Sequence, residues 1–295
     1  MSSTGASAGT APSRTTSLPP AKRFNWSNLG VRVASATVLV PTALAAVWFD
    51  TGLAVGGWPF LVLIAVAVAL LSIEWGGMSA PYAPVRVSTA VTVAILAGVF
   101  LAHREHMWMA WGGLALGGIA SALVARGVAE RPADAAFGVF YIGIACICLV
   151  WLRAMDQGHW WTLMLFAITW TADIAAFAVG SALKGPKLWP RFSPNKTWSG
   201  FVGGLVFATA VGALMTLIPA FELNMAAGAL VGLLGGLATM AGDLWESALK
   251  RRFGVKDSGD LIPGHGGLLD RVDGLLFAAV IIAAARLVNH LGWGH

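Results

Sequence analysis

Long apolar runs separated by short polar segments follow one another from about residue 33 to residue 292. A helix needs about 20 mostly apolar residues to cross the hydrocarbon core of a bilayer. Nine runs approach that length, although the run at 87–102 is short. We expect transmembrane helices at about 33–49, 57–74, 87–102, 108–125, 136–152, 160–180, 199–219, 225–245 and 274–292. The pattern therefore predicts an all-α, polytopic integral membrane protein with about nine spans.

The segment before the first apolar run has a different composition. Residues 1–21 are mostly Ser, Thr, Ala, Gly and Pro, which cannot bury enough apolar surface to order the chain. The segment also lacks the apolar core of a cleavable signal peptide. We therefore predict a disordered cytoplasmic tail at 1–24 and about five transmembrane helices within 25–159. The remaining helices, with two polar cytoplasmic loops, lie within 160–295.

Basic residues are distributed unequally between the two sides of this predicted topology. Lys and Arg concentrate in the cytoplasmic loops of membrane proteins. With the N-terminus in the cytoplasm, 16 of the 19 Lys and Arg residues lie in cytoplasmic segments and two lie in outside loops, while Arg286 lies within the last span. This distribution supports nine spans with the C-terminus outside.

The overall composition agrees with a membrane protein. Charged residues make up 11% of the 295 residues, against about 25% in a typical soluble domain. Hydrophobic residues make up 57%, and the mean hydropathy is +0.75. These values exclude a disordered protein, a soluble nucleic-acid-binding protein and an ordinary cytosolic enzyme. The pI near 9.6 reflects the basic cytoplasmic loops, so we expect the lipid bilayer rather than nucleic acid as a partner.

Two cytoplasmic segments hold about half of the charges. Residues 173–198 and 243–273 contain 9 of the 19 basic residues and 7 of the 14 acidic ones. The other predicted loops are short and carry few charged residues. If the protein catalyses a reaction, the reacting groups belong in these two segments.

The end of the eighth predicted span carries an acidic residue, which we expect to lie slightly below the membrane surface. Asp243, Glu246 or Ser247, and Lys250 share one face of a helix at spacings of three and four residues. A carboxylate within a span costs several kcal/mol unless it faces a partner, a cation or a water-filled cavity. Asp243 is therefore either a functional carboxylate or the ion-pair partner of Lys250 or Arg251.

The loop at 256–267 combines glycines with charged side chains. Glycines let backbone N–H groups approach an anion closely, and Lys256 and His265 could add positive charge. The loop lacks the order of a Walker motif. One interpretation is a flexible solvated connector. The other is a phosphate-binding loop, and because acidic residues lie nearby, that interpretation requires metal ions.

Asp270 and Asp273 open the ninth predicted span. They are three residues apart, share a face and lie where a helix dipole stabilises negative charge. That stabilisation alone could explain them. The functional alternative is that they converge with Asp243 on Mg²⁺, which prefers oxygen ligands and bridges carboxylates to substrate phosphates.

Further candidates lie on or beside other spans. Asp173 lies within the apolar run at 160–180, where an acid is a candidate functional residue or a counter-ion for a basic residue. In the segment 193–200, Ser, Thr and Asn could cap the next helix, and Lys196 could hold a phosphate at its N-terminus. Glu74 ends the second span, where we expect an interfacial residue, and the histidines are expected to be solvated or interfacial.

Taken together, the C-terminal segments resemble a known family. Residues 247–273 contain Ser-Ala-Leu-Lys-Arg, Lys-Asp-Ser-Gly, Pro-Gly-His-Gly-Gly and Asp-Arg-Val-Asp, an order that resembles the signature of the bacterial phosphatidate cytidylyltransferases, or CDP-diacylglycerol synthases. Asp173 with Gly180, and residues 193–200, resemble an upstream conserved stretch of that family. The motifs cover about the C-terminal 45% of the chain. Asn195 departs from the pattern, since a second Lys is common there.

The resemblance implies a dimeric, multi-pass enzyme of the bacterial inner membrane whose active site faces the cytoplasm. Such an enzyme joins CTP to phosphatidic acid and releases CDP-diacylglycerol and pyrophosphate. The resemblance also implies a metal site at Asp243 and Asp270 that holds Mg²⁺, with a monovalent cation such as K⁺ as an option. Two polyanionic reactants require charge neutralisation and alignment, whereas an anionic phosphate nucleophile requires no strong general base.

From the residues and the resemblance together we assign candidate roles. The catalytic candidates are Asp243, Asp270, Lys250 and Arg271. The metal ligands would be Asp243 and Asp270, with support from Asp273. The substrate-binding candidates are Asp173, Ser193, Asn195, Lys196, Arg251, Lys256, Asp257, Gly264, His265, Gly266 and Gly267.

Four other functions are alternatives. A related enzyme could transfer the cytidylyl group to a prenyl lipid, or could act as a CTP-dependent polyprenol kinase that releases CDP. An ion-coupled transporter would explain the acids within the spans but not the loop at 256–267. A scaffold without activity does not explain the concentration of charge in two loops.

Overall fold

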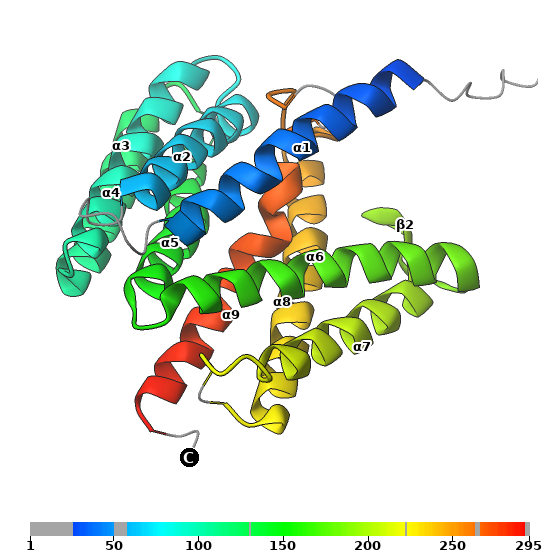
Figure 1. Ribbon diagram of the computed structural model, residues 1–295. Coiled ribbons are helices and arrows are strands. Elements are labelled where there is room, and N and C mark those ends of the chain that lie inside the picture. The colour runs from blue at the N-terminus through cyan, green and yellow to red at the C-terminus, as the bar shows by residue number, and fades with distance from the viewer. Residues whose placement is uncertain (1–25, 50–57, 130, 222, 263–265, 293–295) are drawn as a thin grey trace, which may run out of the picture.

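The computed structural model in Figure 1 describes residues 26–49, 58–129, 131–221, 223–262 and 266–292, with side chains from residue 37 onward. Each of the nine predicted apolar runs lies largely in a helix. The helices are α1 (Trp26–Trp48), α2 (Trp58–Ser79), α3 (Pro84–His103), α4 (Met107–Ala125), α5 (Ala133–Ala154), α6 (Gly158–Leu183), α7 (Trp198–Met215), α8 (Met225–Arg252) and α9 (Leu269–His290).

The prediction of an all-α membrane protein is confirmed. Eight helices, α2 to α9, are long and apolar enough to cross a membrane, and α1 contains a shorter apolar stretch at Thr37–Trp48. The one small departure in the described part of the chain is an antiparallel hairpin of β1 (Lys187–Trp189) and β2 (Ser193–Thr197). The hairpin connects α6 to α7 and lies beside the site described below.

Several helix boundaries differ from the predicted spans. Helix α8 continues seven residues beyond the predicted end, because a helix can leave the membrane with a polar, basic last turn whose charges suit its negative dipole end. It stops where Gly254 adopts a positive φ of 73°. Helix α9 begins at Leu269, five residues earlier than predicted, and α7 ends four residues earlier, at Met215.

The helices form two groups that share an interface. Helices α2 to α5 pack on one another, α6 to α9 pack on one another, and α5 also packs against α9 (Figure 1). Small residues bring α7 and α8 close together: a Cβ added at Gly212 would lie 2.4 Å from the carbonyl oxygen of Gly228. The predicted boundary near residue 159 falls between α5 and α6, and the division into separate domains stays a prediction. The predicted tail at 1–24 lies outside the described residues.

A polar chain of contacts leads from the α2–α5 group to the end of α8, and its last member crosses the interface between the two groups of helices. The indole N–H of the fully buried Trp75 on α2 donates to the carbonyl oxygen of Asp134, 2.9 Å away, at the start of α5. The carboxylate of Asp134 in turn forms an ion pair with Arg252 at the end of α8. These contacts hold the end of α8 against the N-terminal group of helices.

Candidate active site

A cavity of about 1010 Å³ lies where α6, the hairpin, α7, α8 and the first turn of α9 meet. It falls in the upper size range of small-molecule sites. Its lining residues come from both charge-rich segments that the sequence singles out. They are Asp173, Ala176, Phe177, Gly180, Ser181, Lys184, Gly185, Lys187, Leu188, Asn195, Lys196, Thr197, Gly200, Phe201, Met240, Asp243, Leu244, Asp270, Arg271 and Asp273.

The lining combines both signs of charge with apolar surface. Among the described residues, four carboxylates and four basic side chains line the cavity, and α9 contributes side chains of both signs. The acids are Asp173 from α6, Asp243 from α8, and Asp270 and Asp273 from α9, and the bases are Lys184, Lys187, Lys196 and Arg271. Phe177, Phe201 and Met240 add an apolar part. A cavity of this character suits a ligand with several phosphates and an apolar portion.

Asp243 on α8 pairs with Lys196 on β2 across the cavity. The two side chains are 35% and 28% exposed, so the ion pair faces water. The alternative in which Asp243 pairs with Lys250 or Arg251 is wrong: the side chain of Lys250 points toward other acids, and the guanidinium of Arg251 donates to the carbonyl oxygen of Val255 at 3.2 Å. Asp243 and Lys196, 47 positions apart in the sequence, therefore act as one charged pair.

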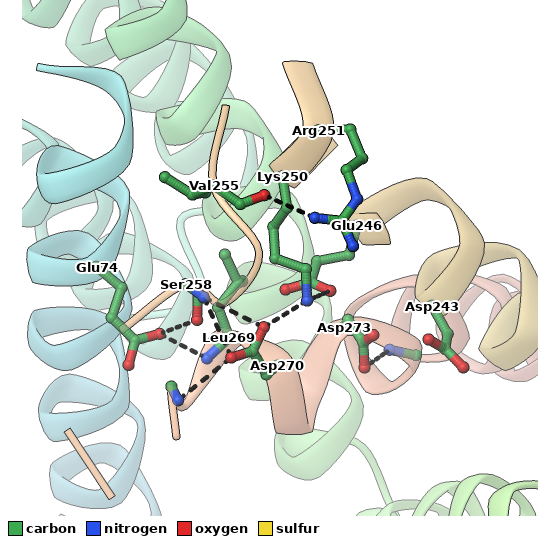
Figure 2. Close-up of polar contacts among 12 residues, drawn as sticks. Glu74, Asp243, Glu246, Lys250, Arg251, Val255, Ser258, Leu269, Asp270 and Asp273 are labelled. Atoms are coloured by element: carbon green, nitrogen blue, oxygen red, sulfur yellow. Dashed lines mark hydrogen bonds and ion pairs between the residues drawn. The ribbon is translucent and has the colours of Figure 1, made fainter. Parts of the chain in front are cut away.

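Lys250 lies between two acids from different helices, as Figure 2 shows. Its ammonium group lies 2.7 Å from Glu246 one turn earlier on α8 and 2.6 Å from Asp270 on α9. The Glu246 side chain is 2% exposed, so this network is buried much more deeply than the Asp243 pair. Lys250 is not among the cavity-lining residues, and the network fixes α8 against the start of α9.

Asp270 accepts hydrogen bonds from the loop as well as from Lys250. The backbone N–H groups of Ser258 and Gly267 donate to its Oδ2 atom at 3.2 Å and 3.3 Å. One turn later, Asp273 accepts from the N–H of Gly274 at 2.8 Å. The side chain of Asp270 is only 12% exposed, yet it reaches the cavity. Asp270 is thus a carboxylate fixed by several donors at the cavity wall.

The described residues of the glycine-rich loop lie behind Asp270 and are not among the cavity-lining residues. Ile262 and Gly266 exchange backbone hydrogen bonds of 2.9 Å and 3.1 Å, and Gly266 has a φ of 84°, which a glycine adopts without strain. Gly267 is buried against Asp270, whereas Lys256 and Asp257 are exposed. Gly264 and His265 lie outside the described residues. A phosphate-binding role for the loop stays a prediction.

The segment at 193–200 forms β2 and the start of α7. Thr197 is the N-cap of α7, because its side chain accepts a hydrogen bond of 3.2 Å from the N–H of Gly200. Asn195 and Lys196 line the cavity, whereas Ser193 lies at the other end of β2, outside the lining. The hairpin therefore delivers Lys196 to the site.

Sequence reasoning missed four charged residues around the site. It treated Lys184 and Lys187 only as cytoplasmic loop charges, although their closeness to Lys196 in the chain was a usable signal. Glu246 was noticed only as one member of a helix face. The expectation that Glu74 is interfacial is wrong: the residue is 3% exposed and its carboxylate contacts the start of α9. No local pattern indicates that contact, since the partners are about 195 residues apart.

The donor set fits a divalent cation held together with a phosphate. Among the described residues, no group of three or more His, Cys, Asp or Glu side chains could hold a metal by itself. Magnesium, however, is usually bound through one or two carboxylates plus substrate phosphates. Asp243, Asp270 and Asp273 present carboxylates to one cavity, which satisfies that lower requirement. The Asp243 carboxylate, partly exposed and held by one lysine, is more available than Asp270.

The fold is that of a multi-pass membrane protein, and its cavity is lined by side chains of both charges beside apolar ones. The chain belongs to the cytidylyltransferase family, whose model matches residues 30–288, and it is accordingly a nucleotidyltransferase. It is 41% identical over 264 residues to a phosphatidate cytidylyltransferase of Brucella suis biovar 1 (strain 1330), covering 87% of this chain and 92% of that protein. A phosphatidate cytidylyltransferase of Rickettsia bellii (strain RML369-C) is 30% identical over 268 residues, covering 89% and 92%. Another, from Staphylococcus haemolyticus (strain JCSC1435), is 40% identical over 152 residues, covering 50% and 58%.

Proposed function

We propose that the protein transfers the cytidylyl group of CTP to phosphatidic acid, giving CDP-diacylglycerol and pyrophosphate for phospholipid biosynthesis. The observation that carries this proposal is the cavity, in which four basic and four acidic side chains lie beside an apolar wall. The family relationship supplies the reaction class, and the names of the similar proteins supply the lipid acceptor.

The reaction requires two anions to approach each other. A phosphate oxygen of phosphatidic acid forms a bond to the α-phosphorus of CTP, and the bond from that phosphorus to the bridging oxygen of the β-phosphate breaks. Pyrophosphate leaves with the bonding electron pair. Lys196 on β2 and Arg271 on α9 both line the cavity and are suited to neutralise this charge and to align the two phosphates. Lys184 and Lys187 add positive charge at the α6–hairpin side.

The two substrates differ in polarity, and so do the walls of the cavity. Phe177 of α6, a cavity-lining residue, is 79% exposed, and Ile174 on the same helix is 68% exposed. Within a bilayer, such side chains face lipid. Phosphatidic acid would therefore bring its glycerol and acyl chains along the α6 wall, while CTP would occupy the charged part near Lys196 and Arg271.

We further propose that Mg²⁺ binds in the cavity through Asp243 and Asp270, with Asp273 in support and a monovalent cation such as K⁺ as an additional ion. When bound, the metal would neutralise the charge that develops on the phosphates. Lys196 can release Asp243 for such a role, because their ion pair is partly exposed to water. Lys250 instead keeps Asp270 oriented.

The proposed setting is the bacterial cytoplasmic membrane, with the N-terminus and the active site on the cytoplasmic side. The distribution of 16 basic residues against two supports this orientation, and most of the cavity lining comes from two predicted cytoplasmic segments and their helix ends. A homodimer is proposed from the family resemblance alone. Crosslinking of the full chain in its native membrane would test that assembly state.

Two differently labelled forms of CTP test the reaction. Purified full-length protein in mixed micelles with phosphatidic acid and Mg²⁺ would receive CTP labelled either at the α- or at the γ-phosphate. We expect the α-label to enter the lipid phase and the γ-label to appear in pyrophosphate. Transfer of the γ-label to a lipid would instead indicate a kinase. Absence of label from the lipid phase under all conditions would contradict the proposal.

A further inference from the structure

Glu74 carries a buried carboxylate five residues before the end of α2, in the group of helices that does not line the cavity. Its Oε1 atom accepts the N–H of Leu268 at 2.6 Å, and its Oε2 atom accepts the N–H of Leu269 at 2.7 Å. Oε2 also accepts the hydroxyl of Ser258 at 3.0 Å. Every one of these donors belongs to the loop before α9 or to its first residue.

The start of α9 has no capping side chain of its own. Leu268 occupies the N-cap position and cannot accept a hydrogen bond through its side chain. The first N–H groups of any helix lack partners within the helix, and leaving them buried and unpaired is costly. Glu74 supplies the missing acceptor from another helix, and its negative charge suits the positive end of the α9 dipole.

Glu74 and Asp270 share the donors of the same turn, as Figure 2 shows. Ser258 donates its N–H to Asp270 and its hydroxyl to Glu74. Gly267 donates to Asp270, while the next two N–H groups donate to Glu74. The two carboxylates therefore accept hydrogen bonds from neighbouring groups of the same loop. A displacement of Glu74 would for this reason also change the surroundings of Asp270.

Two glycines allow the loop to close around Glu74. A Cβ added at Gly259 would lie 3.2 Å from Cγ of Glu74. A Cβ added at Gly267 would lie 3.0 Å from Oε2 of Glu74 and 1.9 Å from the hydroxyl oxygen of Ser258. The contact between the loop and the carboxylate is thus too close for a side chain at Gly267 without a shift.

We propose that Glu74 is a positioning residue for the cytidylyl transfer: it holds the first turn of α9, and with it Asp270 and Arg271, in place at the cavity. The inference rests on the proposed function, because it assigns Glu74 to the same site. Glu74 itself is not among the cavity-lining residues and acts through the backbone of α9.

The substitution Glu74→Gln tests this role with little change in shape. An amide keeps one acceptor oxygen but turns the other into a donor, which would oppose one of the backbone N–H groups. Ser258→Ala is a milder variant that removes one hydroxyl and leaves the N–H to Asp270. Ser72→Ala is the matched control, since Ser72 is buried two residues earlier on α2 and its hydroxyl has no partner among the described residues.

Steady-state kinetics and CTP binding would be measured on full-length protein in mixed micelles, with CTP binding followed by calorimetry in the absence of phosphatidic acid. For Glu74→Gln we expect the KM and the Kd for CTP to rise about tenfold, with a smaller kcat and an unchanged KM for phosphatidic acid. Ser258→Ala should show a smaller rise in the same two quantities, and Ser72→Ala should match the wild type.

The outcomes distinguish a positioning role from a purely structural one. A structural role alone lowers the amount of folded enzyme, which reduces the apparent kcat but leaves both KM values and the Kd unchanged. Such a result, in Glu74→Gln and Ser258→Ala alike, would overturn the proposal while the proposed function stands. If wild-type protein forms no labelled lipid, the proposed function fails, and the CTP affinities still decide whether Glu74 positions the nucleotide site.

Discussion

Asp243 and Asp270 line the same cavity, but their surroundings differ greatly. Asp243 is 35% exposed and pairs with Lys196 from the hairpin. Asp270 is 12% exposed and accepts from Lys250 and from two backbone N–H groups, while Glu74 fixes the turn that carries it. One carboxylate is open and held by a single side chain, and the other is enclosed by a network.

The difference indicates a division of labour within the site. An exposed ion pair exchanges partners at little cost, since such pairs contribute about 0–1 kcal/mol to stability. A carboxylate held by several donors keeps one geometry, which is the property that an active site requires for alignment. We infer that charged ligands enter and leave on the side of the hairpin. On the side of α9, the hydrogen-bonded network keeps Asp270 in one position.

The largest effect is expected for Asp270→Asn. The amide cannot accept from Lys250 and both backbone donors without turning its NH₂ group toward one of them. Removing one partner of a largely buried pair costs about 3–5 kcal/mol. We expect CDP-diacylglycerol formation to fall about 1000-fold and the midpoint of thermal unfolding to drop by several degrees. Near-normal turnover would contradict the claim that a fixed Asp270 is required for the reaction.

Asp243→Asn should have a smaller effect on activity and almost none on stability. Its ion pair faces water, so thermal unfolding should remain close to that of the wild type. Turnover should nevertheless fall about 100-fold, because one proposed magnesium ligand is lost. The concentration of Mg²⁺ needed for half-maximal activity should rise as well. Turnover and Mg²⁺ dependence equal to the wild type would remove Asp243 from the metal site.

Two glycine substitutions compare the enclosed side with the open side. Gly267→Ala places a Cβ among Ser258, Asp270 and Glu74. Gly185→Ala, beside the hairpin, meets only the side chain of Ser199 at 3.7 Å, although its φ of 105° makes alanine unfavourable by about 1 kcal/mol. We expect turnover to fall about tenfold in the first variant and less than about twofold in the second, as measured by lipid product. Equal losses in both would show that backbone strain rather than the enclosed network limits activity.

The smallest effect is expected for Lys187→Gln. Lys187 is exposed at the cavity edge, where it adds attraction for CTP without a fixed partner geometry. We expect the KM for CTP to rise about threefold at low salt, and the difference to disappear at high ionic strength because salt screens exposed charges. A difference that persists at high salt would indicate a direct and specific contact instead.

The sequence predicts the helices and the charged residues of the two polar segments better than the contacts between distant helices. Apolar runs of about 20 residues are a direct consequence of the bilayer, so the sequence predicts nine spans, and eight of these correspond to described helices long and apolar enough to cross a membrane. Asp243, Asp270 and Lys196, which the motifs single out, all line one cavity, while their predicted roles stay predictions. These residues lie in segments whose charge and glycine content depart sharply from the apolar chain around them.

The remaining contacts depend on packing between distant helices. Glu74 reaches the start of α9 only because α2 lies beside the loop that precedes α9, and neither segment carries a local sign of the other. The short strands β1 and β2 have no alternating apolar pattern, because the hairpin is largely exposed. The sequence offers Lys250 as a catalytic candidate or as a partner of Asp243, whereas in the structure it contacts Glu246 and Asp270, and the position of α9 decides that contact.

The most direct test of the account is to locate CTP on the protein. An electron-density map of the full-length enzyme with a non-hydrolysable CTP analogue and Mg²⁺ would show where the α-phosphate lies. The account predicts that it lies in the cavity between Lys196 and Arg271, with Asp243 released from its ion pair and Asp270 unmoved. A nucleotide bound elsewhere on the protein, with the Asp243–Lys196 pair intact, would contradict it.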